Sequence, residues 1–119
     1  MKKYIFIALV FIGTAAYAQT SIQPKFEEEG TIISATYFHD NGAIQQQGTF
    51  NKKGKLDGLW VSYNESGVKL SQGNYDKGIK TGKWFFRTEN SLKEVDYNDS
   101  RITNVNEWNS KSELATTLK

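Results

Sequence analysis

Residues 59–82, LWVSYNESGVKLSQGNYDKGIKTG, decide the fold of this chain. Side chains along Leu59–Tyr63 alternate in the way of a half-buried β-strand. Asn64–Gly67 has the composition of a turn, and its final glycine supplies the positive φ that a chain reversal needs. Val68–Tyr75 then reads as the return strand. The stretch therefore predicts a β-hairpin, and we expect Asp76–Gly82 to turn the chain into the next hairpin.

The same pattern recurs before and after this stretch. The tryptophans Trp60, Trp84 and Trp108 follow one another at intervals of 24 residues, and pairs of glycines follow one another at intervals of 24 or 25. A period in this range is typical of a repeat array. We assign a repeat domain to residues 32–108, with units at about 37–58, 59–82 and 83–107. The glycines that mark the repeat are Gly42, Gly48, Gly58, Gly67, Gly73, Gly78 and Gly82.

The third unit departs from the pattern. Ser91 stands where the second unit has Gly67, and Val95 stands where it has Gly73. An atypical last unit is expected of a cap, because its outer side has no further repeat to cover.

Alternation along the strands predicts how the rings pack. Gly48 and Gly73 point to the same side as Phe50 and Tyr75, and a glycine there leaves a gap in which a large ring can lie across the backbone. We therefore expect an all-β fold: an elongated single-layer antiparallel meander of stacked β-hairpin repeats, with a tryptophan and tyrosine ladder as its core. In the second unit the alternation places Trp60 on one face and Tyr63 on the other.

The first 18 residues have the layout of a secretory signal peptide. Lys2 and Lys3 precede an apolar run, and Ala16–Ala18 forms a small-x-small cleavage site. The apolar run is shorter than the about 20 residues that a membrane span needs. We therefore expect an exported protein, periplasmic or secreted, without a transmembrane segment in its mature chain. Residues 19–31 are predicted to be a flexible leader that contains the solvated acidic run Glu27–Glu29, and residues 109–119 a polar C-terminal tail.

Composition narrows the functions to consider. Without Lys2 and Lys3, the 15 basic residues fall to 13 and equal the 13 acidic ones, so the mature chain is formally neutral. Neutrality removes the usual electrostatic case for a nucleic-acid partner. The chain has no cysteine and one histidine, His39, which excludes disulfides, thiolate metal sites, thiol catalysis and paired-histidine metal sites. We expect no catalytic residues, no metal and no cofactor, and so a protein that is not an enzyme.

The repeat resembles a known family. The spacing of Gly58, Trp60, Tyr63, Gly67 and the residues that follow to Gly82 is similar to the MORN repeat variant of bacterial proteins, also labelled antitoxin-like or MORN-2. The resemblance is closest over Tyr37–Phe86. It implies a stack of β-hairpins in an extended sheet that serves as an interaction module. Similar exported proteins have been named nicotinate-mononucleotide adenylyltransferases, but this chain shows neither the histidine-rich motif nor the βαβ pattern that such an enzyme needs.

The aromatic residues are the candidate binding site, because so short a chain cannot cover both faces of a single-layer sheet. We expect a protein partner, either a second copy of the chain or an envelope protein. The alternative is a glycan- or choline-binding repeat, since Gly82–Phe86 is similar to the aromatic segments of such surface proteins. The proposed anchors of the aromatic face are Trp60, Tyr63, Tyr75, Trp84 and Phe86.

Lysines concentrate in the loops between units. Lys52, Lys53 and Lys55 lie in one loop, and Lys77 and Lys80 occupy the equivalent part of the next unit. Stacked hairpins would place these loops on one edge as a basic rim. The functional interpretation is contact with a membrane surface or an acidic partner. The structural interpretation is that lysines keep sheet edges soluble.

Overall fold

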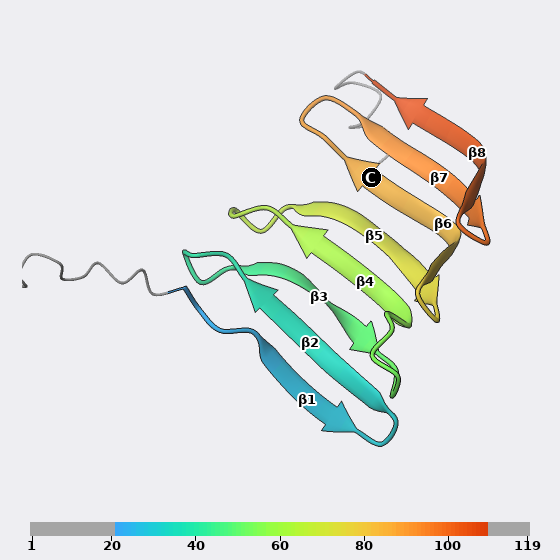
Figure 1. Ribbon diagram of the computed structural model, residues 1–119. Helices are drawn as coiled ribbons and strands as arrows, with labels where there is room; N and C mark the ends of the chain where they lie inside the picture. The colour runs from blue at the N-terminus through green and yellow to red at the C-terminus, as the bar shows by residue number, and fades with distance from the viewer. Residues whose placement is uncertain (1–20, 110–119) are drawn as a thin grey trace, which may run out of the picture.

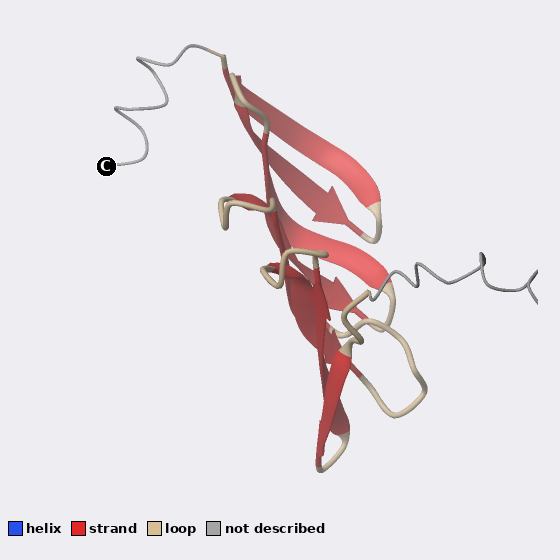
Figure 2. Cartoon of the chain, turned by 90° about the vertical axis from the view of Figure 1, so that its left-hand side faces the viewer, coloured by secondary structure: helices blue, strands red, loops and turns tan. Residues whose placement is uncertain are grey.

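The computed structural model describes residues 21–109, and these form an all-β fold. Eight strands make one open sheet in which each strand pairs antiparallel with the next along the chain (Figure 1). Seen from the side, the sheet is a single layer, and no helix occurs in this range (Figure 2). The predicted fold class is therefore confirmed. The strands are β1 (Lys25–Glu29), β2 (Ile32–Phe38), β3 (Ile44–Phe50), β4 (Gly58–Tyr63), β5 (Lys69–Asp76), β6 (Ile79–Arg87), β7 (Leu92–Asn98) and β8 (Arg101–Trp108).

The sheet begins earlier than the sequence analysis expected. Strand β1 lies within the segment predicted to be a flexible leader, and its five residues pair with β2. The ring of Phe26 meets that of Tyr37 edge to face at 6.0 Å, which ties the strand to its neighbour. The acidic run Glu27–Glu29 thus forms most of an edge strand. The predicted signal peptide and all but the first residue of the predicted C-terminal tail lie outside the described residues.

The link between the second and third hairpins is shorter than predicted. Strand β6 begins at Ile79, so the turn after β5 consists of Lys77 and Gly78 alone. Their φ values are 52° and 89°, and two successive positive φ values are the mark of the tight turn that best matches strand twist. Asp99 and Ser100, with φ values of 58° and 67°, make the equivalent link between β7 and β8.

Hydrogen bonds join neighbouring turns at both ends of the strands. At the hairpin tips, His39 Nε2 lies 2.9 Å from the carbonyl oxygen of Tyr63, and Asn41 Nδ2 donates to the carbonyl oxygen of Glu65 at 3.0 Å. At the opposite end of the strands, the Gly78 amide donates to the Leu56 carbonyl oxygen at 2.7 Å. The first and second repeats are therefore connected through their turns as well as through their strands.

Two indole rings lie flat on glycines of the preceding strand and form the core. A Cβ atom on Gly48 would fall 2.1 Å from Cδ2 of Trp60, and one on Gly73 would fall 1.9 Å from Cδ2 of Trp84. The indole N–H groups donate to the carbonyl oxygens of Thr49 and Asn74 at 2.9 and 3.1 Å. The predicted packing of rings across glycine is confirmed. The other repeat glycines have positive φ values: Gly42, Gly58, Gly67, Gly78 and Gly82.

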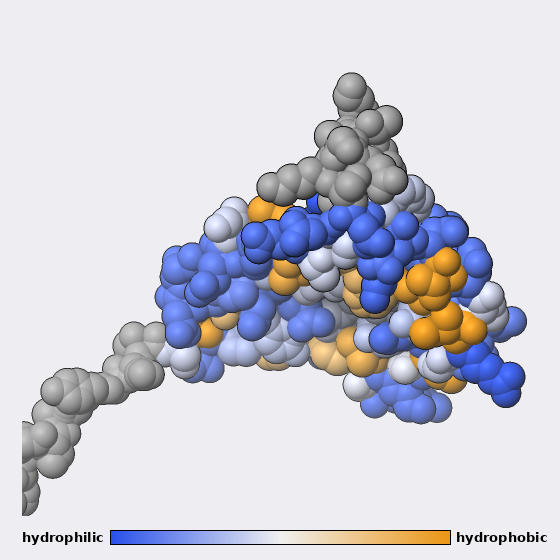
Figure 3. Space-filling model, turned by 90° about the horizontal axis from the view of Figure 1, so that it is seen from above, coloured by the Kyte–Doolittle hydropathy of each residue, from blue (hydrophilic) through white to orange (hydrophobic). Residues whose placement is uncertain are grey.

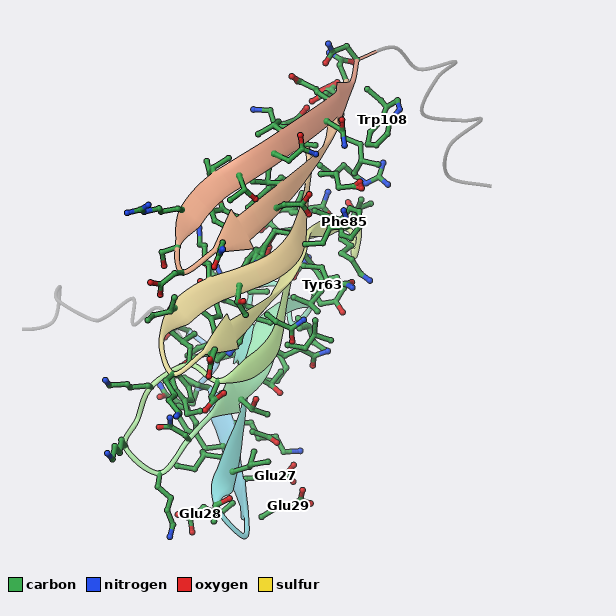
Figure 4. All side chains as sticks on the ribbon, turned by 90° about the vertical axis from the view of Figure 1, so that its right-hand side faces the viewer. Glu27, Glu28, Glu29, Tyr63, Phe85 and Trp108 are labelled. Atoms are coloured by element: carbon green, nitrogen blue, oxygen red, sulfur yellow. The ribbon has the colours of Figure 1, made fainter. Side chains whose placement is uncertain are left out.

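The third tryptophan does not continue this ladder. Val95 occupies the place of the glycine, is buried, and lies opposite Trp84 on one side and Val105 on the other. Trp108 instead pairs with Leu92 and projects to the opposite face of the sheet, the face that also carries Phe85 (Figure 4). The equal spacing of the three tryptophans in sequence is thus not matched by equal positions in the fold.

Candidate functional site

Four of the five predicted anchors come together on one side of the sheet, here called the aromatic face. Tyr75 meets Trp84 edge to face at 5.1 Å, and Phe86 stacks on Trp84 at 5.9 Å. Trp60 lies opposite Gly73, the residue that Trp84 covers. Tyr63 is the exception, because strand alternation and Figure 4 place it on the same side as Phe85 and Trp108. The predicted set therefore spans both faces.

The two tryptophans of the aromatic face are core residues. Trp60 and Trp84 are each 4% exposed, so a partner could touch only the rings around them. Tyr75 and Phe86 are half-buried and border a shallow hollow of about 490 Å³. Polar groups line the same hollow, among them the hydroxyls of Ser62 and Ser71, which lie 2.6 Å apart.

Lys80 covers the aromatic cluster. Its Nζ atom lies 5.2 Å from the ring centre of Trp84, 5.9 Å from that of Phe86 and 5.1 Å from that of Tyr97. These distances are those of cation–π contacts. Lys80 therefore belongs to the aromatic face rather than to the basic rim in which the sequence analysis placed it. Its ammonium group also takes the position that the head group of choline would need.

The opposite face, here called the groove face, carries an apolar groove near the C-terminal end of the sheet. The groove has a volume of about 420 Å³, and its apolar walls come from four strands. Leu92 is buried in its floor, whereas Leu70 at its rim is 37% exposed. Elsewhere, hydrophobic side chains reach the surface in separate patches among hydrophilic ones (Figure 3). The apolar residues of the groove are Leu70, Phe85, Leu92 and Trp108.

The polar residues of the groove differ in how far they are already paired. Glu94 lies 3.4 Å from Lys83 Nζ, which also donates to Asp96 at 3.0 Å. The hydrogen bond to Asp96, together with that to Glu94, raises the pKa of Lys83 above its ordinary value. Arg87 has no carboxylate within salt-bridge distance among residues 21–109. The groove thus combines apolar walls with one guanidinium that can accept an anionic partner.

Lysines gather in a second hollow at the opposite end of the sheet. It has a volume of about 350 Å³ and lies between the β3–β4 loop, the β5–β6 turn and the β1–β2 turn. The predicted meeting of the loops of neighbouring units is confirmed for all the lysines except Lys80. We call this site the lysine hollow; it is lined by Thr31, Asn51, Lys52, Lys53, Lys55, Asp57 and Lys77.

Within the described range, no group of three or more histidine, cysteine, aspartate or glutamate side chains is placed to hold a metal ion. In the same range, no helix is long and apolar enough to cross a membrane. Comparisons with protein-family models, with curated proteins and with solved structures found no match to this chain.

The sequence analysis did not identify the groove. One signal was present, because the alternation that put Trp84 and Phe86 on one face put Phe85 and Arg87 on the other. The sequence did not reveal the position of Trp108, because the equal spacing of the tryptophans suggested a third ring in the ladder. The groove depends on that departure from the repeat.

Proposed function

We propose that this chain is an exported, non-catalytic interaction module of the MORN type that binds a protein partner through its groove face. The observation that supports the proposal is the apolar groove formed by Leu70, Phe85, Leu92 and Trp108. On the aromatic face the large rings already pack on one another, whereas the groove leaves its apolar walls open. An open hollow with aromatic walls and one arginine is the kind of site in which interface anchors concentrate.

The groove also indicates the chemistry of the partner. Its volume of about 420 Å³ is enough for one or two apolar side chains, and the guanidinium of Arg87 favours a carboxylate beside them. Glu94 opposes that carboxylate less than an unpaired glutamate would, because it shares the ammonium group of Lys83 with Asp96. The proposed partner is therefore an envelope protein that presents a short segment of apolar residues next to an aspartate or glutamate.

Site-specific photo-crosslinking tests this proposal. The full chain is expressed with a photo-reactive residue at position 70, in the groove, or at position 79, outside it; Leu70 and Ile79 are 37% and 39% exposed. We expect crosslinking to one envelope protein from position 70 only, through a segment of the stated composition. Equal products from both positions, or none from position 70 in cells that make the protein, would contradict the groove as the binding site.

Substitutions in the same background measure the affinity. Leu70→Lys and Arg87→Glu should each weaken binding of the identified partner by roughly tenfold or more, which corresponds to about 1.4 kcal/mol. Ile79→Lys is the matched control and should leave the affinity unchanged. The proposed export has its own readout: the N-terminal residue of the protein isolated from cells should be Gln19, the residue after the predicted cleavage site.

A second function, glycan binding, is favoured by the hollow on the aromatic face. Tyr75 and Phe86 offer rings on which a sugar could stack, and Ser62 and Ser71 offer hydroxyls for its hydrogen bonds. Choline fits less well, because Lys80 already occupies the aromatic cluster. Titration with envelope glycans should shift tryptophan emission if this function is correct, and Phe86→Ala should abolish the shift while Ile79→Lys, outside the hollow, leaves it.

A further inference from the structure

We propose that two copies of this chain associate through their N-terminal ends, with strand β1 of each copy lying against the lysine hollow of the other. This contact is independent of the groove. It rests on two oppositely charged surfaces that lie next to each other on one molecule and that the fold leaves open.

The acidic surface is the edge strand β1. Glu27, Glu28 and Glu29 are all exposed on a strand that has a neighbour on one side only (Figure 4). Lys25 approaches Glu27 only to 4.0 Å, and both side chains are about two-thirds exposed, so this pair neutralises little of the charge. Glu27 and Glu29 point to the groove face and Glu28 to the other face, so the three carboxylates flank the free edge of β1 on both sides and form an acidic edge (Figure 4).

The basic surface is the lysine hollow. It has four lysines and one aspartate, Asp57, whose carboxylate also accepts a hydrogen bond from Asn51 Nδ2 at 3.2 Å. None of the four lysines lies within salt-bridge distance of a carboxylate in the described part of the chain. The formal charge of the hollow is thus equal and opposite to that of the three glutamates.

The two surfaces adjoin through the β1–β2 turn. Thr31, two residues after Glu29, is itself part of the lining of the hollow. When opposite charges adjoin on one molecule, a two-fold axis between two copies brings each acidic edge onto the hollow of the other copy, and both contacts form at once. Phe26 and Ile32, which are 55% and 48% exposed beside the acidic edge, would contribute apolar area to the same contact.

The shape of a two-fold contact also explains why a second copy is the partner. A second copy of the chain supplies both carboxylates for the lysine hollow and lysines for the acidic edge. An acidic ligand alone would pair only with the lysine hollow. The closed contact would further cover the edge of β1, which otherwise presents unpaired backbone groups to solvent.

Charge exchange between variants tests the proposal. The first variant, Glu27→Lys/Glu28→Lys/Glu29→Lys, makes both surfaces basic; the second, Lys52→Glu/Lys53→Glu/Lys55→Glu, makes both acidic. All these side chains are exposed, so folding should be retained, and circular dichroism checks it. The full chain is expressed and purified in the form to which the cell processes it. Analytical ultracentrifugation measures the mass of the purified protein. Glu65→Lys/Glu89→Lys, at the opposite turns, is the control.

We expect the wild type and the control to form a dimer that weakens as ionic strength rises. The dissociation constant of the dimer should rise roughly a hundredfold or more in each charge-reversed variant, because like charges then face each other. An equimolar mixture of the two variants should recover the dimer, since every contact again joins opposite charges.

Four results would overturn the proposal: a wild type that stays monomeric at low ionic strength, a variant that dimerises like the wild type, a mixture that stays monomeric, or a mass that grows beyond the dimer. The last would mean a head-to-tail contact and not a two-fold one. Because the crosslinking from position 70 does not depend on this contact, failure here leaves the proposed partner in the groove standing.

Discussion

The second and third repeats solve the same packing problem in different ways. In the second repeat, Gly73 lets the indole of Trp84 lie directly on the backbone, where it is 4% exposed. In the third, Val95 fills that space with its own side chain, and Trp108 pairs with Leu92 on the other face. The tryptophan keeps its spacing in the sequence but not its role in the fold.

The difference shows that the ladder needs both a position without a Cβ atom and a register that brings a tryptophan opposite it; Val95 instead lies opposite Val105. A ring cannot stack on a strand whose side chain already stands in its place, because a Cβ at Gly73 would lie 1.9 Å from the indole of Trp84. Ending the ladder has a second effect, since the displaced Trp108 becomes one wall of the groove. The terminal repeat thereby acquires a surface that the inner repeats lack.

The two tryptophans should differ most when each is removed. Trp84→Ala deletes a buried ring that touches Tyr75, Phe86 and Tyr97, and it should lower the free energy of unfolding by about 4 kcal/mol. Trp108→Ala deletes a half-buried ring and should cost roughly 1 kcal/mol. Urea unfolding of both variants measures the difference. Equal losses would mean that the two rings are equivalent after all.

Adding a single methyl group to the ladder should be nearly as harmful. Gly73→Ala places a Cβ atom inside the volume of the Trp84 ring, and we expect a loss of about 2.5 kcal/mol from the forced movement of the indole. Asn74→Ala, at the exposed next position of the same strand, is the control and should change stability by less than about 0.5 kcal/mol. A stable Gly73→Ala variant would show that the ring has room to move.

The reverse change in the third repeat should not restore the ladder. Val95→Gly removes a side chain that is 5% exposed and leaves a gap beside Trp84, so we expect a loss of about 2 kcal/mol. Trp108 should stay on the groove face, because its strand pairing with Leu92 fixes the side to which it points. If the variant were as stable as the wild type and its tryptophan emission showed one more buried ring, Val95 would be the sole cause of the departure.

The smallest effect should come from the lysine that covers the aromatic face. Lys80→Met keeps most of the aliphatic contact with Trp84, Phe86 and Tyr97 but removes the charge. The expected loss is about 0.5 kcal/mol, the value of an exposed cation–π contact. Lys77→Met, in the lysine hollow, should leave stability unchanged in the same urea titration. An unchanged Lys80→Met variant would indicate that the ammonium adds nothing to the cluster.

The local pattern of the chain was enough to predict the hairpins. Glycine and asparagine mark the turns, and strand alternation gave the face of Trp60 and of the glycines on which rings lie. These features depend on residues close in sequence or on the repeat itself. The all-β meander followed from them, because short links between hairpins permit little else.

The features that sequence did not reveal depend on pairing between distant segments. Strand β1 forms from a polar, acidic segment because β2 offers it an edge and Tyr37 offers its ring to Phe26. Lys80 sits in a stretch expected to be a turn, and only the tight reversal at Lys77–Gly78 brings it into a strand and over the rings. The groove required the true register of β8, which spacing alone misplaced.

The join between strands β3 and β4 has a mechanical consequence. These strands are in register only over Gln46–Gln47 and Val61–Ser62, a shorter match than at any other join of the sheet. Because the strands lie side by side in chain order, a pull that separates β1 from β8 puts the same force on every join of the sheet. Because few backbone pairs hold the β3–β4 join, its resistance to such a pull depends on side chains: the indole of Trp60 on Gly48 and its hydrogen bond to the carbonyl oxygen of Thr49.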